Sequence, residues 1–353
     1  MENVKCGKCV ATLVICLGLF MVPLGAYGLN GDAKPDFIQS WGTGSQGWHI
    51  ATDGTAQMGY WSGNAQIDFH DAVLSSVNGG GNDAILINKA TDNIEWTEAF
   101  GGGNAVSGTA VNGGVAVTGY TKVSAGYLNT AGNISLIASD GTGLSVFDYN
   151  ATSGDFDQTA QSVSGYDDVT AGYINNTNLN GFVATNASGG DAYQMLAGVP
   201  TKIGSVLDSG GVNPVTDIGH PELGNIDGDM NADLAYLDSA GTFHWAEFNG
   251  TNFIDKGVSV TSSQGAIFRD ISLGNDADGD GYGEIIAANS NVTDDRIEFN
   301  GVTVVSTFGN AGGGGYHNVA YERDESLFQV PEPMTMSLLG LGALAVIRRK
   351  RSA

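Results

Sequence analysis

Residues 270–289 read DISLGNDADGDGYGEIIAAN and place a loop of alternating acids and glycines between two short apolar runs. Runs this short, bounded by Gly, Asn and Asp, are typical of β-strands joined by turns. The stretch therefore predicts two strands connected by a loop that is rich in carboxylates.

The same arrangement recurs about every fifty residues. The second residues of six related segments are Asp71, Lys122, Asp168, Asp217, Asp270 and Asn318. Their intervals range from 46 residues (122 to 168) to 53 residues (217 to 270). A turn and three more strand-like runs follow most of these segments, and four strands in 40 to 50 residues are typical of one β-propeller blade. The sequence therefore predicts an all-β fold, a six-bladed β-propeller.

The two ends of this array complement each other. The segment at Asn318 supplies only one strand, whereas three unassigned strand-like runs begin at Asp36, Trp48 and Ala56. We expect N- and C-terminal strands to share the closing blade. A separate seventh blade and an open array of β-sandwiches are the structural alternatives.

The N-terminus has the layout of a secretory signal peptide. Lys5 and Lys8 precede an apolar run over residues 9–22, and a small-x-small triplet ends at Gly28. We therefore expect residues 1–28 to form a signal helix that is removed. The three cysteines of the chain, Cys6, Cys9 and Cys16, all lie in this segment, so the mature protein would contain no disulfide and no thiolate ligand.

The C-terminus has three parts in a fixed order. A VPEP motif is followed by an apolar stretch, residues 336–347, and then by a basic cluster. The motif consists of Val330, Pro331, Glu332 and Pro333, and the cluster of Arg348, Arg349, Lys350 and Arg351. The stretch is short for a permanent span of about 20 residues, and the basic cluster would remain on the cytoplasmic side. This pattern predicts a sorting helix that contacts the inner membrane only transiently.

Residues 330–353 resemble the PEP-CTERM sorting signal. The resemblance implies processing by an exosortase in a Gram-negative bacterium, followed by a location at the cell surface or in the extracellular matrix. Together, the two end segments divide the chain into a signal peptide (1–28), a working domain (29–329) and a sorting signal (330–353).

Charge restricts the partners of the working domain. The chain has a net charge of −24. Removing the six basic and two acidic residues of the end segments leaves 14 − 6 = 8 Lys and Arg against 38 − 2 = 36 Asp and Glu. Such a surface repels nucleic acid and anionic lipid and attracts cations, calcium above all. Solubility outside the cell is the simpler explanation of the same charge.

Two loops have the spacing of a calcium site. Oxygen-bearing side chains occupy positions 1, 3, 5 and 9, glycine occupies position 4, and position 7 can offer its carbonyl oxygen. The sets are Asn225, Asp227, Asp229, Asn231 (carbonyl) and Asp233, and Asp276, Asp278, Asp280, Tyr282 (carbonyl) and Glu284. Calcium takes six to eight hard oxygen ligands, so two Ca²⁺ sites are predicted. The alternative is that Asp-Gly sequences simply make good turns.

These loops resemble the calcium loops of FG-GAP/VCBS repeats, the family of integrin-like β-propellers. The resemblance implies that each of the two sets holds one structural Ca²⁺, the first more weakly because Asn225 replaces an acid. Asn30, Asp32 and Asp36 are a partial match. The copies near Asp83, Asn133 and Asn180 lack the acids.

The sequence contains no convincing catalytic constellation. The five histidines do not cluster at metal-ligand spacing, and acid pairs such as Asp167 and Asp168 are expected by chance in so acidic a chain. We therefore predict a non-catalytic binding or structural component whose partner is exopolysaccharide or a surface protein. The alternative is a secreted polysaccharide-active hydrolase, which would require two or more buried polar groups converging at the propeller axis.

Overall fold

The computed structural model describes the chain from residue 36 to residue 321, with gaps. The described ranges are 36–40, 45–50, 56–58, 68–75, 77, 83–97, 108–128, 134–175, 179–229, 231–262, 267–274, 283–290, 294–300, 303–309 and 318–321. These ranges contain 25 strands, β1 to β25, and no helix. The all-β fold predicted from the sequence is therefore confirmed.

Twenty-four of the strands form six antiparallel units of four. Unit 1 contains β4 (Phe69–Ser75), β5 (Asp83–Asn88), β6 (Ile94–Thr97) and β7 (Gly108–Asn112). Unit 2 contains β9 (Lys122–Gly126), β10 (Ser135–Ser139), β11 (Gly143–Asn150) and β12 (Asp155–Ser164). Unit 3 contains β13 (Asp168–Asn175), β14 (Leu179–Asn186), β15 (Gly189–Leu196) and β16 (Val199–Leu207).

The remaining units have the same order. Unit 4 contains β17 (Gly219–Gly224), β18 (Asp233–Leu237), β19 (Phe243–Phe248) and β20 (Phe253–Val260). Unit 5 contains β21 (Phe268–Leu273), β22 (Ile285–Asn289), β23 (Asp294–Asn300) and β24 (Thr303–Gly309). Unit 6 contains β25 (Asn318–Tyr321), β1 (Asp36–Ser40), β2 (Ser45–Ile50) and β3 (Ala56–Met58). The additional strand β8 (Val115–Ala116) pairs with β7.

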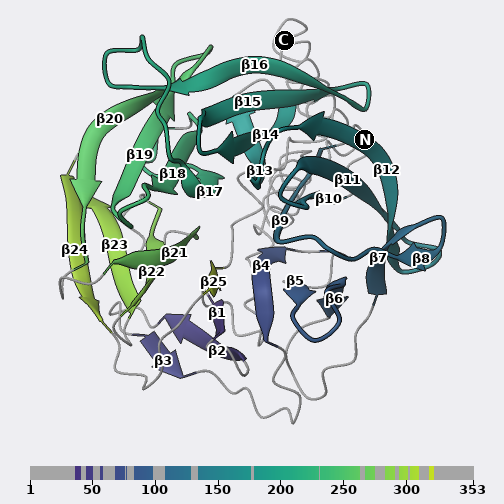
Figure 1. Ribbon diagram of the computed structural model, residues 1–353. Coiled ribbons are helices and arrows are strands. Elements are labelled where there is room, and N and C mark those ends of the chain that lie inside the picture. The colour runs from purple at the N-terminus through teal and green to yellow at the C-terminus, as the bar shows by residue number, and fades with distance from the viewer. Residues whose placement is uncertain are drawn as a thin grey trace, which may run out of the picture.

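The units surround a common centre. The first strand of each unit lies nearest this centre and the fourth strand lies at the periphery (Figure 1). Consecutive first strands touch in a closed cycle, β4 to β9, β13, β17, β21, β25 and back to β4. The ring therefore closes on itself without a disulfide.

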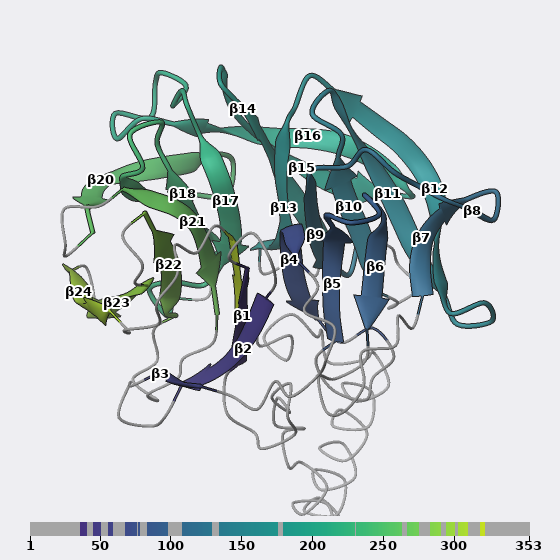
Figure 2. The same cartoon turned by 60° about the horizontal axis from the view of Figure 1, so that its bottom comes forward.

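Unit 6 closes the ring with both ends of the described chain. Strand β25 pairs antiparallel with β1, with Ile38 opposite Ala320 and Ser40 opposite Asn318. The same strand contacts β4 of unit 1 and β21 of unit 5, and it lies between them (Figure 2). The pairing of N- and C-terminal strands predicted from the sequence is observed.

Two pairs of neighbouring units are also joined at their outer edges. Strand β7 pairs in parallel with β12, and β16 pairs in parallel with β20. These joints extend over two residue pairs each, so the hydrogen-bonded sheets contain nine, eight, four and four strands. The sequence does not predict this continuity, because no periodic pattern marks the joined residues.

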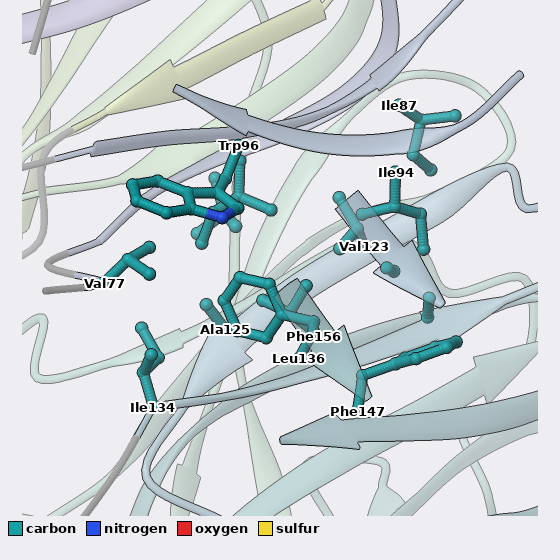
Figure 3. Packing of buried hydrophobic residues seen from close by; sticks show 14 residues of the cluster. Val77, Ile87, Ile94, Trp96, Val123, Ala125, Ile134, Leu136, Phe147 and Phe156 are labelled. Carbon is teal, nitrogen blue, oxygen red and sulfur yellow. The ribbon is translucent and has the colours of Figure 1, made fainter. Parts of the chain in front are cut away.

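The hydrophobic core lies between neighbouring units. Between units 1 and 2, one cluster contains Trp96, Phe147 and Phe156 together with aliphatic side chains of β5, β9 and β10 (Figure 3). Similar clusters lie between units 2 and 3, 3 and 4, 4 and 5, and 6 and 1. Strands such as β10 and β18 are buried along their whole length, which explains their unbroken apolar or small residues.

Both predicted end segments, residues 1–28 and 330–353, lie outside the described residues. In the part of the chain that is described, no helix has the length and apolarity needed to cross a membrane.

Candidate metal centre and axial polar cluster

The first acidic loop, residues 225–233, connects β17 to β18 in unit 4. Gly228 has a φ of 77°, which glycine adopts without the steric cost that a side chain would add. The turn thus forms where the sequence placed its glycine, and the chain returns to a strand at Asp233. All of this loop except residue 230 is described.

Asp233 is fully buried, and only one of its carboxylate oxygens is used. Its Oδ2 accepts hydrogen bonds from the backbone N–H of Ile226 at 2.7 Å and of Asp227 at 3.2 Å. Its Oδ1 is buried without a hydrogen-bond partner. A buried oxygen in this state is costly unless a water or an ion satisfies it.

The other loop oxygens cap backbone N–H groups. Asn225 Oδ1 accepts from Gly228 N at 2.9 Å, Asp227 Oδ1 accepts from Asp229 N at 3.1 Å, and Asp229 Oδ1 accepts from Asn231 N at 2.7 Å. Among the residues with described positions, no group of three or more His, Cys, Asp or Glu side chains could hold a metal ion. The donor chemistry suits Ca²⁺, but the loop would have to contract around the ion.

The loop lacks positive charge. Burial raises the pKa of Asp233 to about 8, and the negative charge of Asp227 adds to this effect, whereas the hydrogen bonds from Ile226 and Asp227 oppose it. Burial also raises the pKa of Asp227, and Asp229 and Glu247 contribute repulsion. A bound cation would relieve this repulsion.

The second acidic loop is described only at its end. Asp276, Asp278, Asp280 and Tyr282 lie outside the described residues. Glu284 is buried immediately before β22, one position earlier relative to its strand than Asp233, which is the first residue of β18. The adjacent Gly283 donates from its N–H to Ile226 O at 3.1 Å, so the end of the second acidic loop lies beside the start of the first.

A similar carboxylate cap occurs in unit 1, where the loop lacks the other acids. Asp83 begins β5, is buried, and accepts a hydrogen bond from Val77 N at 2.9 Å through Oδ2. The carboxylate cap is therefore a common structural feature of these loops, whereas the further acids Asp227 and Asp229 occur only in the 225–233 loop of the two. Of the partial set, Asp36 begins β1, and Asn30 and Asp32 are outside the described ranges.

A second group of polar residues lies near the N-terminal ends of the first strands of the units. Strand pairing places Lys122, Asp168 and Asp270 at equivalent positions, opposite Ser139, Thr185 and Ala288. Extending the same register to the other units gives Asp71, His220 and Asn318. We call Asp71, Lys122, Asp168, His220 and Asp270 the axial cluster.

The axial cluster is linked across units. Lys122 Nζ lies 3.5 Å from Asp168 Oδ2 and 3.2 Å from His220 Nδ1, and the same imidazole nitrogen lies 2.7 Å from Asp270 Oδ1. Asp71 Oδ2 accepts from Val123 N at 2.8 Å, and Asp168 Oδ2 accepts from His220 N at 3.1 Å. The side chains of units 2 to 5 therefore form a continuous polar network, and Asp71 of unit 1 joins it through the backbone of β9.

The electrostatics of the axial cluster are dominated by three carboxylates around one ammonium group. Burial raises the pKa of Asp71 to about 8; Lys122 opposes this shift, and Asp270 and Asp168 add to it. Burial acts to lower the pKa of Lys122, but Asp168, Asp71 and Asp270 together outweigh it and raise that pKa. Lys122 therefore remains charged, while Asp71 retains a proton to unusually high pH.

The sequence contained part of the signal for this cluster. Four of its five residues coincide with the second residues of the repeated segments, but in unit 4 the predicted Asp217 is replaced by His220. Asp217 precedes β17, and a register shift between Gly219 and Glu222 brings His220 into line, with a φ of 49°. Since the bulge follows from backbone geometry rather than from a residue pattern, spacing alone could not place His220.

Comparison with curated proteins finds no match to this chain. Among solved structures, a protein from Bacteroides uniformis ATCC 8492, described as a candidate 6-phosphogluconolactonase, is similar at 12% identity and a TM-score of 0.47. The likeness covers 79% of this chain and 83% of that chain. At this level it carries no argument about fold or activity.

The C-terminus is similar to a known family over a short segment. Residues 329–351 match the model of the PEP-CTERM protein-sorting motif, which includes the VPEP motif, the apolar stretch and the basic cluster. The sorting signal predicted from the sequence is therefore confirmed, and the chain carries a PEP-CTERM motif that implies export and processing by an exosortase.

Proposed function

We propose that this chain is an exported, calcium-stabilised six-bladed β-propeller of the FG-GAP/VCBS type. In this proposal the propeller is a non-catalytic binding or structural component of the cell surface or exopolysaccharide matrix. Six antiparallel four-stranded units and the closed cycle of their first strands support the propeller assignment. In the proposed domain organisation, the propeller begins at residue 29, after the signal peptide, and the sorting signal begins at residue 330.

One observation carries the calcium proposal. Asp233 Oδ1 is buried without a hydrogen-bond partner in a loop that also contains Asp227 and Asp229. A turn that served only to connect two strands would not need an oxygen in this costly state. Bound Ca²⁺ would stabilise unit 4 through Asp233. A second ion would stabilise unit 5 through Glu284.

The surface role follows from export and charge. The sorting motif directs the chain out of the cytoplasm, and a net charge of −24 disfavours nucleic acid and anionic lipid as partners. Exopolysaccharide or a surface protein then remains as the proposed partner after maturation by the exosortase.

Calcium-dependent melting tests this proposal. The exported chain is melted with Ca²⁺ and with excess EGTA, and the experiment is repeated for Asp233→Asn. Calcium should raise the melting temperature of the wild type, whereas the variant should lose part of this rise without losing stability in EGTA, since it no longer buries an ionisable carboxyl group.

Asp140→Asn is the matched control. Asp140 caps a turn through Oδ1, which accepts from the N–H groups of Thr142 and Gly143, but it is not part of an acidic loop. This variant should keep the full calcium response. An unchanged wild-type melting curve in calcium and EGTA would mean that the acidic loops serve only as turns.

The axial cluster favours a second candidate, a polysaccharide-active hydrolase with its site at the axis. Several buried polar groups converge there, and a perturbed acid such as Asp71 is a common feature of active sites. Hydrolysis of chromogenic glycosides by the wild type, lost in Asp270→Asn at unchanged melting temperature, would support this candidate. No hydrolysis by the wild type would leave the binding role.

A further inference from the structure

Glu247 is a carboxylate outside the 225–233 loop that faces it from the next strand. In the β18–β19 pairing, Glu247 lies directly opposite Asp233. Side chains at such positions are on the same face of the sheet, with Cβ atoms about 4.5–5.5 Å apart, and like charges there are destabilising. The sheet therefore places a second carboxylate beside the one whose Oδ1 has no partner.

Lys256 is held next to this pair by an irregularity of β20. Between the pairs His244–Ser259 and Ala246–Asp255 the register shifts, so that residues 256–258 stand opposite Trp245 alone. Gly257 has a φ of 69°, and bulges of this kind redirect side chains. The Lys256 ammonium contacts Glu247 Oε2 and lies 5.4 Å from the centre of the Trp245 ring.

Lys256 reaches the loop through Glu247, which lies opposite Asp233. Its contact with Glu247 is the main cause that raises the pKa of Lys256, and the charges of Asp227 and Asp233 contribute further. The Lys256 side chain is 34% exposed and the Glu247 side chain 27% exposed. Both can therefore move without disrupting the core.

The coordination number of Ca²⁺ leaves room for Glu247 as a further ligand. The loop offers five ligating residues, whereas Ca²⁺ takes six to eight oxygens. We propose that Glu247 and Lys256 set the calcium affinity of the 225–233 loop from outside it, Glu247 as a further carboxylate for the ion and Lys256 as a tethered cation that competes with the ion. This inference rests on the proposed calcium binding and adds two residues that lie outside the loop motif.

The competition follows from charge. Without the ion, the Lys256 ammonium group partly neutralises the crowded carboxylates. A divalent cation in the loop repels this ammonium group, which frees Glu247 from its ion pair and leaves its carboxylate beside Asp233. Removing Lys256 should therefore strengthen calcium binding, and removing the charge of Glu247 should weaken it.

Calorimetric titration of the metal-free exported chain with CaCl₂ tests the inference. Lys256→Gln should tighten the affected site by about 3- to 10-fold, and Glu247→Gln should weaken it by a similar factor, as expected for a single nearby charge at partial exposure. Lys256→Arg keeps the charge and should bind calcium as the wild type does.

Lys202→Gln is the matched control, because it removes the ammonium group of a half-exposed lysine on β16 that pairs with Asp191 on β15. Trp245 gives a second readout. Since Lys256 lies over its ring, calcium should change tryptophan emission in the wild type and less so in Lys256→Gln, even where calcium is still bound.

The outcomes separate the two proposals. If the wild type binds calcium and both Glu247→Gln and Lys256→Gln bind it with the affinity of Lys202→Gln, the inference is wrong and the proposed calcium site stands. If the wild type shows no binding heat and no calcium-dependent melting, the calcium site itself is wrong and the inference falls with it.

Discussion

Burial at the axis makes the charged form of Asp71 unfavourable in the native state. It is one of three carboxylates near Lys122, so one ammonium group cannot neutralise them all. The backbone N–H of Val123 donates to its Oδ2 at 2.8 Å, but this hydrogen bond does not offset burial. The native state instead retains a proton on Asp71.

Asp71→Asn should therefore change how stability depends on pH. The native pKa of about 8 lies above the ordinary value of 3.8, so the unfolded chain loses this proton first. The contribution of Asp71 to wild-type stability falls as pH rises from about 4 to about 8, by at most about 1.4 kcal/mol per pH unit, and then levels off. Asparagine removes this contribution, so the variant should gain stability relative to wild type between pH 5 and pH 8 in urea unfolding.

The exposed Asp217→Asn is the control for this experiment. Asp217 has a φ of 59°, which asparagine also tolerates. It should follow the wild-type profile. Parallel profiles for Asp71→Asn and wild type would show that Asp71 does not hold the extra proton.

At the scale of elements, the outer-edge joints between units depend on close backbone approach. A Cβ on Gly204 would lie 1.8 Å from Thr251 O, and one on Gly108 would lie 2.0 Å from Gly154 O. Each joint also has a side-chain acceptor, since Asn252 Oδ1 accepts from Ser205 N and Asp155 Oδ1 accepts from Thr109 N. Units 1–2 and units 3–4 are thus joined in the same way.

Gly204→Ala should separate this joint. Because the methyl group would meet backbone atoms of Thr251 and Asn252 in the turn between β19 and β20, this turn and β16 must move apart, and we expect a loss of about 2 kcal/mol in the free energy of unfolding. Gly210→Ala is the control, since its Cβ would lie 3.4 Å from the nearest atom, Asp208 Oδ1. Equal unfolding midpoints for the two variants would show that the β16–β20 joint does not constrain the fold.

The elements also show where sequence reasoning succeeds. The predicted runs at Asp83, Asp233 and Glu284 lie at or beside the starts of β5, β18 and β22, because short buried strands need apolar residues between turn formers. The bulge at His220 and the parallel joint at Gly204 were not predicted, because each depends on contacts between distant residues. The loop residues of the proposed calcium site were found from spacing, whereas Glu247 becomes visible only through strand register.

At the scale of the whole molecule, the ring of units closes where the N- and C-terminal strands pair, as the sequence predicts. A ring of units has no exposed first or last unit only if its ends meet. Strand β25 meets this need by pairing with β1 and by contacting β4 and β21. Ile38 and Ala320 join Phe69 and Leu74 in the cluster that seals units 6 and 1.

Removal of residues 318–329 should therefore open the ring. The truncated chain would lose the β25–β1 hydrogen bonds and expose the apolar side chains that β25 covers, so it should melt at a lower temperature and scatter X-rays with a larger radius of gyration than the chain with β25. A synthetic peptide of residues 318–329 should restore part of the melting temperature in a concentration-dependent way, whereas a scrambled peptide of the same composition should not. If the truncated chain instead melts and scatters like the intact one, the contacts of β1 with the remaining units suffice, and closure by the C-terminal strand contributes little to stability.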